Sequence, residues 1–329
     1  MDFEKLYEKL NNEQKHAVDT LDGPVMVVAG PGTGKTQVLT LRIANILTKT
    51  DTTPSAILAL TFTESAAKSM RERLSKIIGK DAYLVNINTF HSFAASVISE
   101  NPDVFLIGEG YDILSDIERL TVIHKILDTE ELEYLCPSGD PYFYSYYISS
   151  SISTLKREGI TYENYKELVS GNTSLIEQIN LKEKRTANDL NEIKKLSKQV
   201  ELKKLYKAYQ KELKKLKRYD FEDLINFVNE AFEKDETLLR NYQERFLYIL
   251  VDEFQDTNNS QYKLLTNLTS FWGSDSDIFV VGDDDQSIFR FQGASVENMM
   301  VFLKNFPNSK VINLVNNYRS TQLVLDSAR

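Results

Sequence analysis

The chain has 329 residues, of which 42% are hydrophobic and 11% aromatic. This is enough to build the core of one large or two ordinary domains, and it argues against global disorder. The formal net charge of −9 excludes a protein that is basic over its whole surface, but it leaves room for a local basic patch. Cys136 is the only cysteine, which excludes an intramolecular disulfide. The sequence has neither an apolar signal segment nor an apolar run of membrane-spanning length. We therefore expect a cytoplasmic protein with no membrane contact.

Strands and helices alternate in the first part of the chain. Short apolar runs predict buried strands at 24–29, 55–62 and 83–90, and periodic apolar residues predict helices at 11–20 and after the first two strands. Alternation of this kind is typical of a parallel sheet whose strands are joined by crossover helices.

The pattern changes after the third strand. Helical periodicity dominates from about 91 to 215, and strand-like runs return at 246–253, 277–284 and 310–317. The predicted fold is therefore an α/β domain with a parallel sheet, interrupted by a mostly helical insertion. The final residues, 320–329, read as the first turns of a helix with Ser320 as N-cap and no stop signal, so we expect a fragment of a longer protein.

One segment is strongly basic. Residues 181–218 hold 14 Lys and Arg against 5 Asp and Glu, a balance of +9 that leaves −18 for the rest of the chain. One interpretation is a solvated helix whose apolar residues recur at helical spacing. Its buried face would then consist of Leu202, Leu205, Tyr209, Leu213 and Leu216. The other interpretation is a surface that faces nucleic acid, and the sequence leaves both open.

The strand at 24–29 runs into AGPGTGKT, which matches the phosphate-loop pattern G-x-x-x-x-G-K-[ST] except that Ala29 replaces the first glycine. Glycines let the backbone curl so that its N–H groups face phosphates, and the N-terminus of the following helix adds partial positive charge. Lys35 is expected to reach the β- and γ-phosphates of a nucleotide, and Thr36 to bind Mg²⁺. The predicted nucleotide-binding loop comprises Ala29, Gly30, Pro31, Gly32, Thr33, Gly34, Lys35 and Thr36.

The run ILVDEFQDT (249–257) ends a predicted strand in three carboxylates. In parallel α/β sheets, ligands bind outside the carboxyl ends of the strands, where these side chains can face the phosphate loop. Asp252 is predicted to hold Mg²⁺, and Glu253 to orient the attacking water and accept its proton. For Asp256, a ligand role and a structural hydrogen-bonding role both stay open.

Further motifs surround these two. They are LNNEQKHAV (10–18), LTFTESAAKSMRERL (60–74), NTFHSF (88–93), YDFEDL (219–224), VDEFQDTN (251–258), VGDDDQSIFRFQGA (281–294) and LVNNYRS (314–320). In this order they resemble motifs Q, Ia, Ib, Id, II, III and IV of the UvrD/Rep/PcrA-like superfamily 1 DNA helicases. The resemblance spans residues 10–320 and implies a RecA-like P-loop NTPase fold.

The resemblance also implies roles around the nucleotide. Gln14 would read the adenine edge, Tyr318 would stack on the base, and Gln37 stands where the family often has an arginine beside the adenine. Gln286 would sense the γ-phosphate, and Arg319 would stabilise the charge of the transition state.

Four residues fall where the family contacts single-stranded DNA: Phe62, Thr63, His91 and Phe291. Aromatic faces suit this task because base stacking tolerates any sequence. For Phe62 and His91 the alternative is a place in the buried core. We expect Phe291 to face DNA and Phe289 to pack inward.

The domain organisation implied by the resemblance has three parts. Residues 1–95 and 216–300 would form the first RecA-like domain, 96–215 the helical insertion, and 301–329 the start of a second RecA-like domain. The family's motifs V and VI, which belong to that second domain, are not found in this sequence.

The predicted function is an ATP- and Mg²⁺-dependent 3′→5′ DNA helicase or translocase acting on single-stranded DNA and single-strand/duplex junctions. The sequence leaves DNA repair, replication restart, recombination and plasmid maintenance open as its pathway. The polarity follows from the resemblance alone, and the second RecA-like lobe is the expected partner of this chain. One alternative is the motor part of a RecB/AddA-like helicase–nuclease. Another is a module that binds nucleotide and DNA with little turnover.

Overall fold

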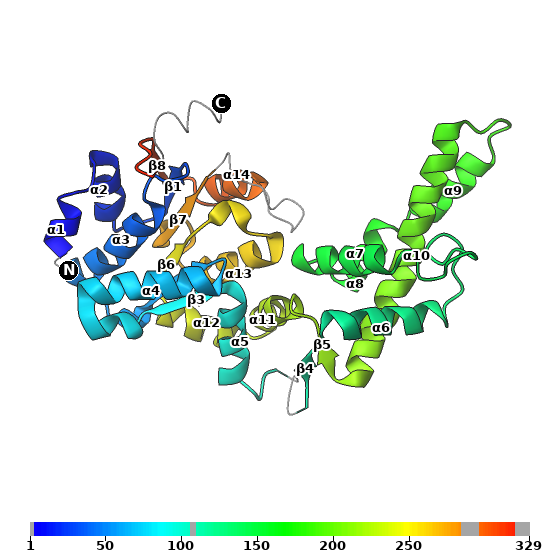
Figure 1. The fold of residues 1–329 in the computed structure, drawn as a ribbon, viewed down its shortest axis with the longest axis horizontal. Helices are drawn as coiled ribbons and strands as arrows, with labels where there is room; N and C mark the ends of the chain where they lie inside the picture. Colours follow the sequence, from blue (N-terminus) through cyan, green and yellow to red (C-terminus); the bar gives the residue numbers. More distant parts are fainter. Residues whose placement is uncertain (1–2, 106–109, 284–295, 320–329) are drawn as a thin grey trace. The chain divides into compact units, whose positions relative to one another are not determined.

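The structure is a computed structural model that describes residues 3–105, 110–283 and 296–319 (Figure 1). The chain divides into two compact units. Unit 1 comprises Met1–Val104 and Phe227–Arg329, and unit 2 comprises Phe105–Asn226.

Unit 1 is built around a six-stranded sheet in which every pairing is parallel. Its strands are β1 (Val25–Ala29), β2 (Ile57–Thr61), β3 (Asn86–Thr89), β6 (Tyr248–Val251), β7 (Ile278–Gly282) and β8 (Lys310–Leu314). Their order across the sheet is β3-β2-β6-β7-β1-β8. The four inner strands are almost wholly buried, which explains why the sequence shows them as continuous apolar runs. The predicted α/β fold with a parallel sheet is confirmed.

Helices connect these strands. They are α1 (Phe3–Tyr7), α2 (Asn12–Asp19), α3 (Lys35–Lys49), α4 (Glu64–Ile78), α5 (Phe90–Glu100), α11 (Asp223–Lys234), α12 (Glu236–Arg245), α13 (Asn259–Thr269) and α14 (Val296–Asn305). Side chains cap several of their first turns, as when Thr63 accepts from the Ala66 amide and Thr89 from the Ser92 amide. Because these caps directly follow strands β2 and β3, each helix begins at the carboxyl edge of the sheet.

A buried arginine joins two of these helices to the sheet. Arg42 of α3 is 1% exposed, and its guanidinium donates to the carbonyl oxygens of Ala17, Thr20 and Leu21 at the end of α2. The same group lies 4.3 Å from the ring centroid of Phe279 in β7, and burial lowers the pKa of Arg42 to about 10. A charge that a sequence reader would place on the surface thus fixes α2 in position.

The units divide at 104/105 and 226/227, whereas we expected 95/96 and 215/216, and the segment assigned to a second domain from 301 contributes a strand to the sheet of unit 1. Helix α5 continues to Glu100, whose carboxylate accepts hydrogen bonds from Tyr242 at 2.9 Å and Arg245 at 2.8 Å, both of α12. At the other end, β8 pairs with β1, as in the register Val27↔Ile312. Residues through Leu314 therefore complete the first sheet.

Unit 2 is mostly helical, as predicted for the insertion. It contains α6 (Asp116–Leu127), α7 (Ser145–Arg157), α8 (Tyr162–Leu168), α9 (Asn172–Asn180), α10 (Ala187–Leu216) and a two-residue parallel pair, β4 (Asp112–Ile113) with β5 (Arg218–Tyr219). The predicted buried face of α10 holds for Leu202, Leu205, Tyr209 and Leu213. Leu216, however, is 46% exposed because the helix ends there. Throughout the described parts of both units, no helix is long and apolar enough to cross a membrane.

A charged network is buried within unit 2. The Lys156 ammonium lies 2.5 Å from Asp220 and 2.7 Å from Asp223, and the Tyr209 hydroxyl donates to Asp220 at 2.8 Å. Burial alone would lower the pKa of Lys156, but the two carboxylates outweigh it and raise that pKa. Arg119 adds a second cation at 3.1 Å from Asp220. The network fixes YDFEDL, the motif in which the chain leaves the insertion.

Replacing Lys156 with Met is expected to lower the free energy of unfolding by about 3–5 kcal/mol, because the variant leaves the Asp223 carboxylate without the ammonium that neutralises it. Burial already raises the pKa of Asp223, and removal of the ammonium raises it further, so the loss shrinks as the pH falls below this folded-state pKa and grows as the pH rises through it. Urea unfolding followed by circular dichroism at several pH values measures both effects. Lys166→Met is the control, since Lys166 and Glu163 form an exposed pair at 3.3 Å, and equal losses in the two variants contradict the prediction.

Candidate nucleotide-binding site

The phosphate loop joins β1 to α3. Gly32 and Gly34 have φ values of +75° and +90°, a region in which residues with a Cβ are strained. Inside the loop, the Thr33 hydroxyl donates to the Gly30 carbonyl at 2.8 Å. Helix α3 begins immediately after Gly34, so Lys35 and Thr36 occupy its first turn, where backbone N–H groups favour anions.

Helix α2 holds the loop from one side. The buried Gln14 side chain donates to the Thr33 carbonyl at 2.8 Å and also completes a capping box with Asn11. A Cβ on Gly34 would lie 2.9 Å from Gln14 Nε2, so the glycine is needed for this close approach. Gln14 therefore lies against the phosphate loop, in keeping with its expected place beside the nucleotide.

The segment after β8 closes on the loop from the other side. The Tyr318 amide donates to the Gly32 carbonyl at 2.9 Å, and the Asn317 side chain donates to the Pro31 carbonyl at 2.8 Å. Asn11 also donates to the Tyr318 hydroxyl at 3.0 Å. The Tyr318 ring is 63% exposed, and Arg319 is exposed beside it. Two segments far apart in sequence, at residues 11–14 and 317–319, thus meet at one loop.

The acidic end of β6 faces the same loop. Lys35 Nζ lies 2.9 Å from a carboxylate oxygen of Glu253. Glu253 adopts the left-handed conformation, with φ of 49°, which turns the chain sharply as the strand ends. Such a conformation costs about 1–2 kcal/mol in a residue other than glycine, and it is typical of functional sites.

The two neighbouring aspartates are poorly solvated. Burial, reinforced by the Glu253 carboxylate, raises the pKa of Asp252 to about 7 and that of Asp256 to about 6. The positive charge of Lys35 partly offsets the rise in the pKa of both aspartates. The charge of Arg73 in α4 partly offsets the rise in the pKa of Asp252. The edge of the sheet therefore concentrates negative charge that favours a nearby cation.

Gln255 is a connecting residue for which the motifs predicted no role. Its amide donates to Glu253 at 2.9 Å and to Asp256 at 3.3 Å, while its carbonyl oxygen accepts from the Asp283 amide at 2.9 Å. Gly282 permits this contact, since a Cβ there would lie 3.1 Å from the Gln255 side chain. The end of β7 is thereby tied to the carboxylates after β6. The position of this glutamine between Glu253 and Asp256 was the one feature of the sequence that could have indicated its role.

The residues at this edge fit a Mg²⁺ ion that binds with a nucleotide. Within the described ranges, no three His, Cys, Asp or Glu side chains form a group able to hold a metal by themselves. Mg²⁺ beside a nucleotide normally takes one or two protein ligands together with phosphates and waters. The buried Asp252 carboxylate meets that need, and Asp256 Oδ1 is a buried oxygen without a hydrogen-bond partner in the described structure.

The predicted DNA-contacting residues follow other strands of the sheet. Phe62 and Thr63 come directly after β2, and His91 lies in the first turn of α5 after β3. Phe62 and His91 are half-buried, and Thr63 is exposed while capping α4. Because all strands are parallel, these residues lie at the same edge of the sheet as the phosphate loop. Gln286, Phe289 and Phe291 lie outside the described residues.

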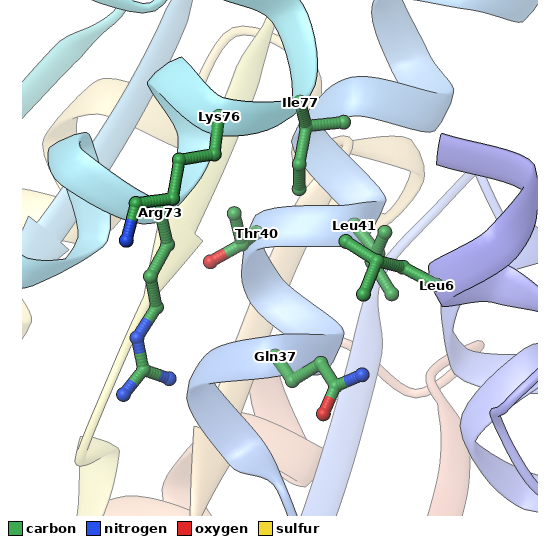
Figure 2. Close-up of a pocket in the computed structure, with 7 residues that line it drawn as sticks. All are labelled: Leu6, Gln37, Thr40, Leu41, Arg73, Lys76 and Ile77. Carbon is green, nitrogen blue, oxygen red and sulfur yellow. The ribbon is translucent and has the colours of Figure 1, made fainter. Parts of the chain in front are cut away.

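A cavity of about 230 Å³ adjoins the start of α3 (Figure 2). It is lined by Leu6, Gln37, Thr40, Leu41, Arg73, Lys76 and Ile77. Leu6, Leu41 and Ile77 give it an apolar wall, whereas Arg73 and Lys76 extend from α4 on the opposite side. Gln37 is therefore half-buried beside a hollow, one residue beyond the phosphate loop.

A glycine-rich loop between a parallel strand and a helix, facing carboxylates at the same sheet edge, defines a P-loop nucleotide-binding domain. The sequence matches the family described as "UvrD/REP helicase N-terminal domain" over residues 10–307. The chain belongs to this family, which confirms the resemblance drawn from the motifs.

Curated relatives agree with this assignment. The chain is 34% identical over 324 residues to "ATP-dependent DNA helicase PcrA" of Staphylococcus aureus strain Mu50, and 35% identical over 323 residues to the protein of the same name in Staphylococcus epidermidis strain RP62A. Each match covers 98% of this chain and 40% of the relative, so the chain spans less than half of their length.

Replacing Gly32 with Ala is expected to destabilise the fold by at least about 1–2 kcal/mol, the cost of a left-handed conformation with a Cβ. The new Cβ would also lie 2.6 Å from Asn317 Oδ1 and 2.7 Å from Arg319 Cβ, so the segment after β8 must shift. Chemical unfolding measures the loss. Gly139→Ala is the matched control, because a Cβ there meets nothing within 4 Å; similar effects of the two variants contradict the prediction.

Replacing Gln255 with Ala is expected to lower the free energy of unfolding by about 1–3 kcal/mol, because the buried Asp283 amide loses its acceptor. The same unfolding experiment tests it. Gln178→Ala, at an exposed position of α9, should change stability little. A neutral Gln255→Ala variant rules out a structural role for this bridge.

Proposed function

We propose that this chain is the nucleotide-binding and first strand-binding part of an ATP-dependent DNA helicase. The observation that carries the proposal is the contact of 2.9 Å between Lys35 of the phosphate loop and Glu253 after β6. It places a cation suited to phosphates beside a carboxylate suited to a water molecule. The family membership and the names of the relatives support the same function.

The proposed roles follow from this geometry. Phosphates that enter the loop compete with Glu253 for Lys35, so binding releases the carboxylate to orient the attacking water and accept its proton. Thr36 and Asp252 would hold Mg²⁺, whose positive charge would offset that of the phosphate oxygens. Arg319, exposed beside the loop, would add positive charge as charge develops on the transferred phosphate.

Base recognition uses the two segments that grip the loop. Gln14 and Tyr318 both contact the loop backbone, so the adenine edge and face would be read by residues whose positions depend on the phosphate loop itself. Gln37, which lines the cavity at the start of α3, would flank the base.

DNA would bind along the same edge of the sheet. Phe62, Thr63 and His91 follow strands on the far side of β6 from the phosphate loop, where partly exposed rings and a hydroxyl suit single-stranded DNA. Gln286 and Phe291, outside the described residues, would complete the contacts between nucleotide and DNA. In the whole protein, a second RecA-like lobe, 3′→5′ movement and action at single-strand/duplex junctions complete the proposal.

Binding of a fluorescent ATP analogue with Mg²⁺ to the 329-residue chain tests the nucleotide site. Lys35→Ala should weaken binding at least about tenfold, because it removes a charge-assisted contact to phosphate. Lys49→Ala is the control, since Lys49 lies at the far end of the same helix and pairs with Asp19 on the surface. Equal binding by both variants and the unmodified chain refutes the proposed site.

Hydrolysis of ATP, measured with and without oligo(dT), separates binding from chemistry. Glu253→Gln should keep nucleotide binding and lose about 10²- to 10⁴-fold of whatever hydrolysis the chain supports, the usual contribution of a general base. Hydrolysis that survives this change would remove Glu253 from the catalytic role.

A further inference from the structure

A dense group of aromatic residues marks the start of α7 in unit 2. The stretch PYFYSYY (141–147) contains Tyr142, Phe143, Tyr144, Tyr146 and Tyr147. Four of these side chains are exposed, with fractions of 66% for Phe143, 77% for Tyr146, 49% for Tyr147 and 40% for Tyr142. Large apolar rings gathered on a surface mark an interaction site more often than single exposed residues do.

Packing of the unit does not require these rings. The buried side of α7 is formed by Ser145, Ile148, Ile152, Ser153 and Lys156. Ile148 and Ile152 join the core of unit 2, while Tyr146 and Tyr147 fall between these positions and point outward. The exposed rings are therefore available to a ligand.

Lys198 of α10 lies over two rings of this group, Tyr144 and Tyr147. Lys198 Nζ lies 3.9 Å from the ring centroid of Tyr144 and 5.8 Å from that of Tyr147. The pKa of the Tyr144 hydroxyl is lowered, first by a hydrogen bond with Lys198 and also by the charges of Lys198 and Lys194. Two cations thus accompany the aromatic group, which is also ordered internally by edge-on contacts of Tyr144 with Phe143 at 4.8 Å and with Tyr147 at 6.1 Å.

The charge around the group is uneven. At one end, Tyr142 donates its hydroxyl to Asp128 at 2.7 Å and its amide to Asp140 at 3.0 Å, and it stacks on His124. At the other end, Tyr144 and Tyr147 lie beside Lys198. An anionic ligand is therefore favoured beside Tyr144 and Tyr147, next to which Phe143 and Tyr146 lie in the sequence, and disfavoured beside Tyr142.

We propose that Phe143, Tyr146 and Tyr147 form a stacking surface for unpaired bases of single-stranded DNA, with Lys194 and Lys198 contacting its phosphates. Rings that stack on bases, next to cations that follow the backbone, are the usual means of binding single strands without sequence preference. A protein partner fits less well, because lysine is depleted from the centres of protein interfaces. The choice of DNA rests on the proposed function; the site itself is separate from the phosphate loop and from Phe62 and His91.

Photo-crosslinking locates the ligand directly. The full chain is irradiated with an oligo(dT) that carries 4-thiothymidine, and crosslinked peptides are identified by mass spectrometry. The proposal expects crosslinks within 142–147, and their absence, with crosslinks confined to unit 1, overturns it.

Fluorescence anisotropy with labelled oligo(dT) measures the contribution of the rings. Tyr146→Ala and Phe143→Ala should each weaken binding at least about fivefold, whereas Tyr146→Phe, which keeps the ring, should bind like the unmodified chain. Lys198→Ala should weaken binding and reduce its dependence on salt. Tyr83→Ala is the matched control, because Tyr83 is 70% exposed and precedes β3 at the opposite end of the strand from the candidate site.

The remaining outcomes are equally decisive. Circular dichroism shows whether each variant folds. If Phe143→Ala misfolds, the comparison of Tyr146→Ala with Tyr146→Phe still tests the proposal. If the unmodified chain fails to bind oligo(dT), or if the ring variants instead abolish self-association in sedimentation, the proposal is wrong. In either case, the proposed nucleotide site still stands if nucleotide binding depends on Lys35. Failure of the stacking surface is therefore distinguishable from failure of the proposed function.

Discussion

The ion pair between Lys35 and Glu253 depends on the parallel sheet. The two residues are 218 positions apart, yet their side chains meet because β1 and β6 both flank β7 and run in the same direction. Strands that run in parallel bring the segments after their carboxyl ends to one edge of the sheet. The phosphate loop, the carboxylates, Phe62, His91 and the segment that carries Tyr318 all come after carboxyl ends of strands. Reversal of any one strand would remove its residues from the site.

Three residues at that edge, Gly32, Gly34 and Glu253, adopt left-handed backbone conformations. Gly32 and Gly34 take left-handed conformations that suit a residue without a side chain, and both are crowded by residues from other segments. Glu253 takes a similar conformation while bearing a long side chain. The difference is informative, because the loop needs space around its backbone, whereas the acidic turn needs a carboxylate in a specific direction.

The sequence allowed much of this arrangement to be predicted. Apolar runs located all six strands of the sheet, since central parallel strands are buried on both faces, and the spacing of GKT after β1 located the phosphate loop. The carboxylates at the end of β6 were predicted by the same logic.

Other features depend on contacts between distant residues. The end of α5 is held by hydrogen bonds from Tyr242 and Arg245 to Glu100, and the place of β8 is set by its pairing with β1. Arg42 and Lys156 look like surface charges in sequence because nothing local announces the carbonyls or carboxylates that bury them. Gln255 likewise acquires its role only through Asp283, which comes after another strand.

The short pairing of β4 with β5 has a consequence for how such a chain can change over evolution. Two segments near the ends of unit 2, which comprises Phe105–Asn226, are paired with each other, with Asp112 opposite Arg218 and Ile113 opposite Tyr219. A module whose two connections lie side by side can be lengthened, shortened or exchanged by recombination without altering the span that the host sheet must bridge. A change of length between β4 and β5 therefore leaves the distance between these two segments unchanged.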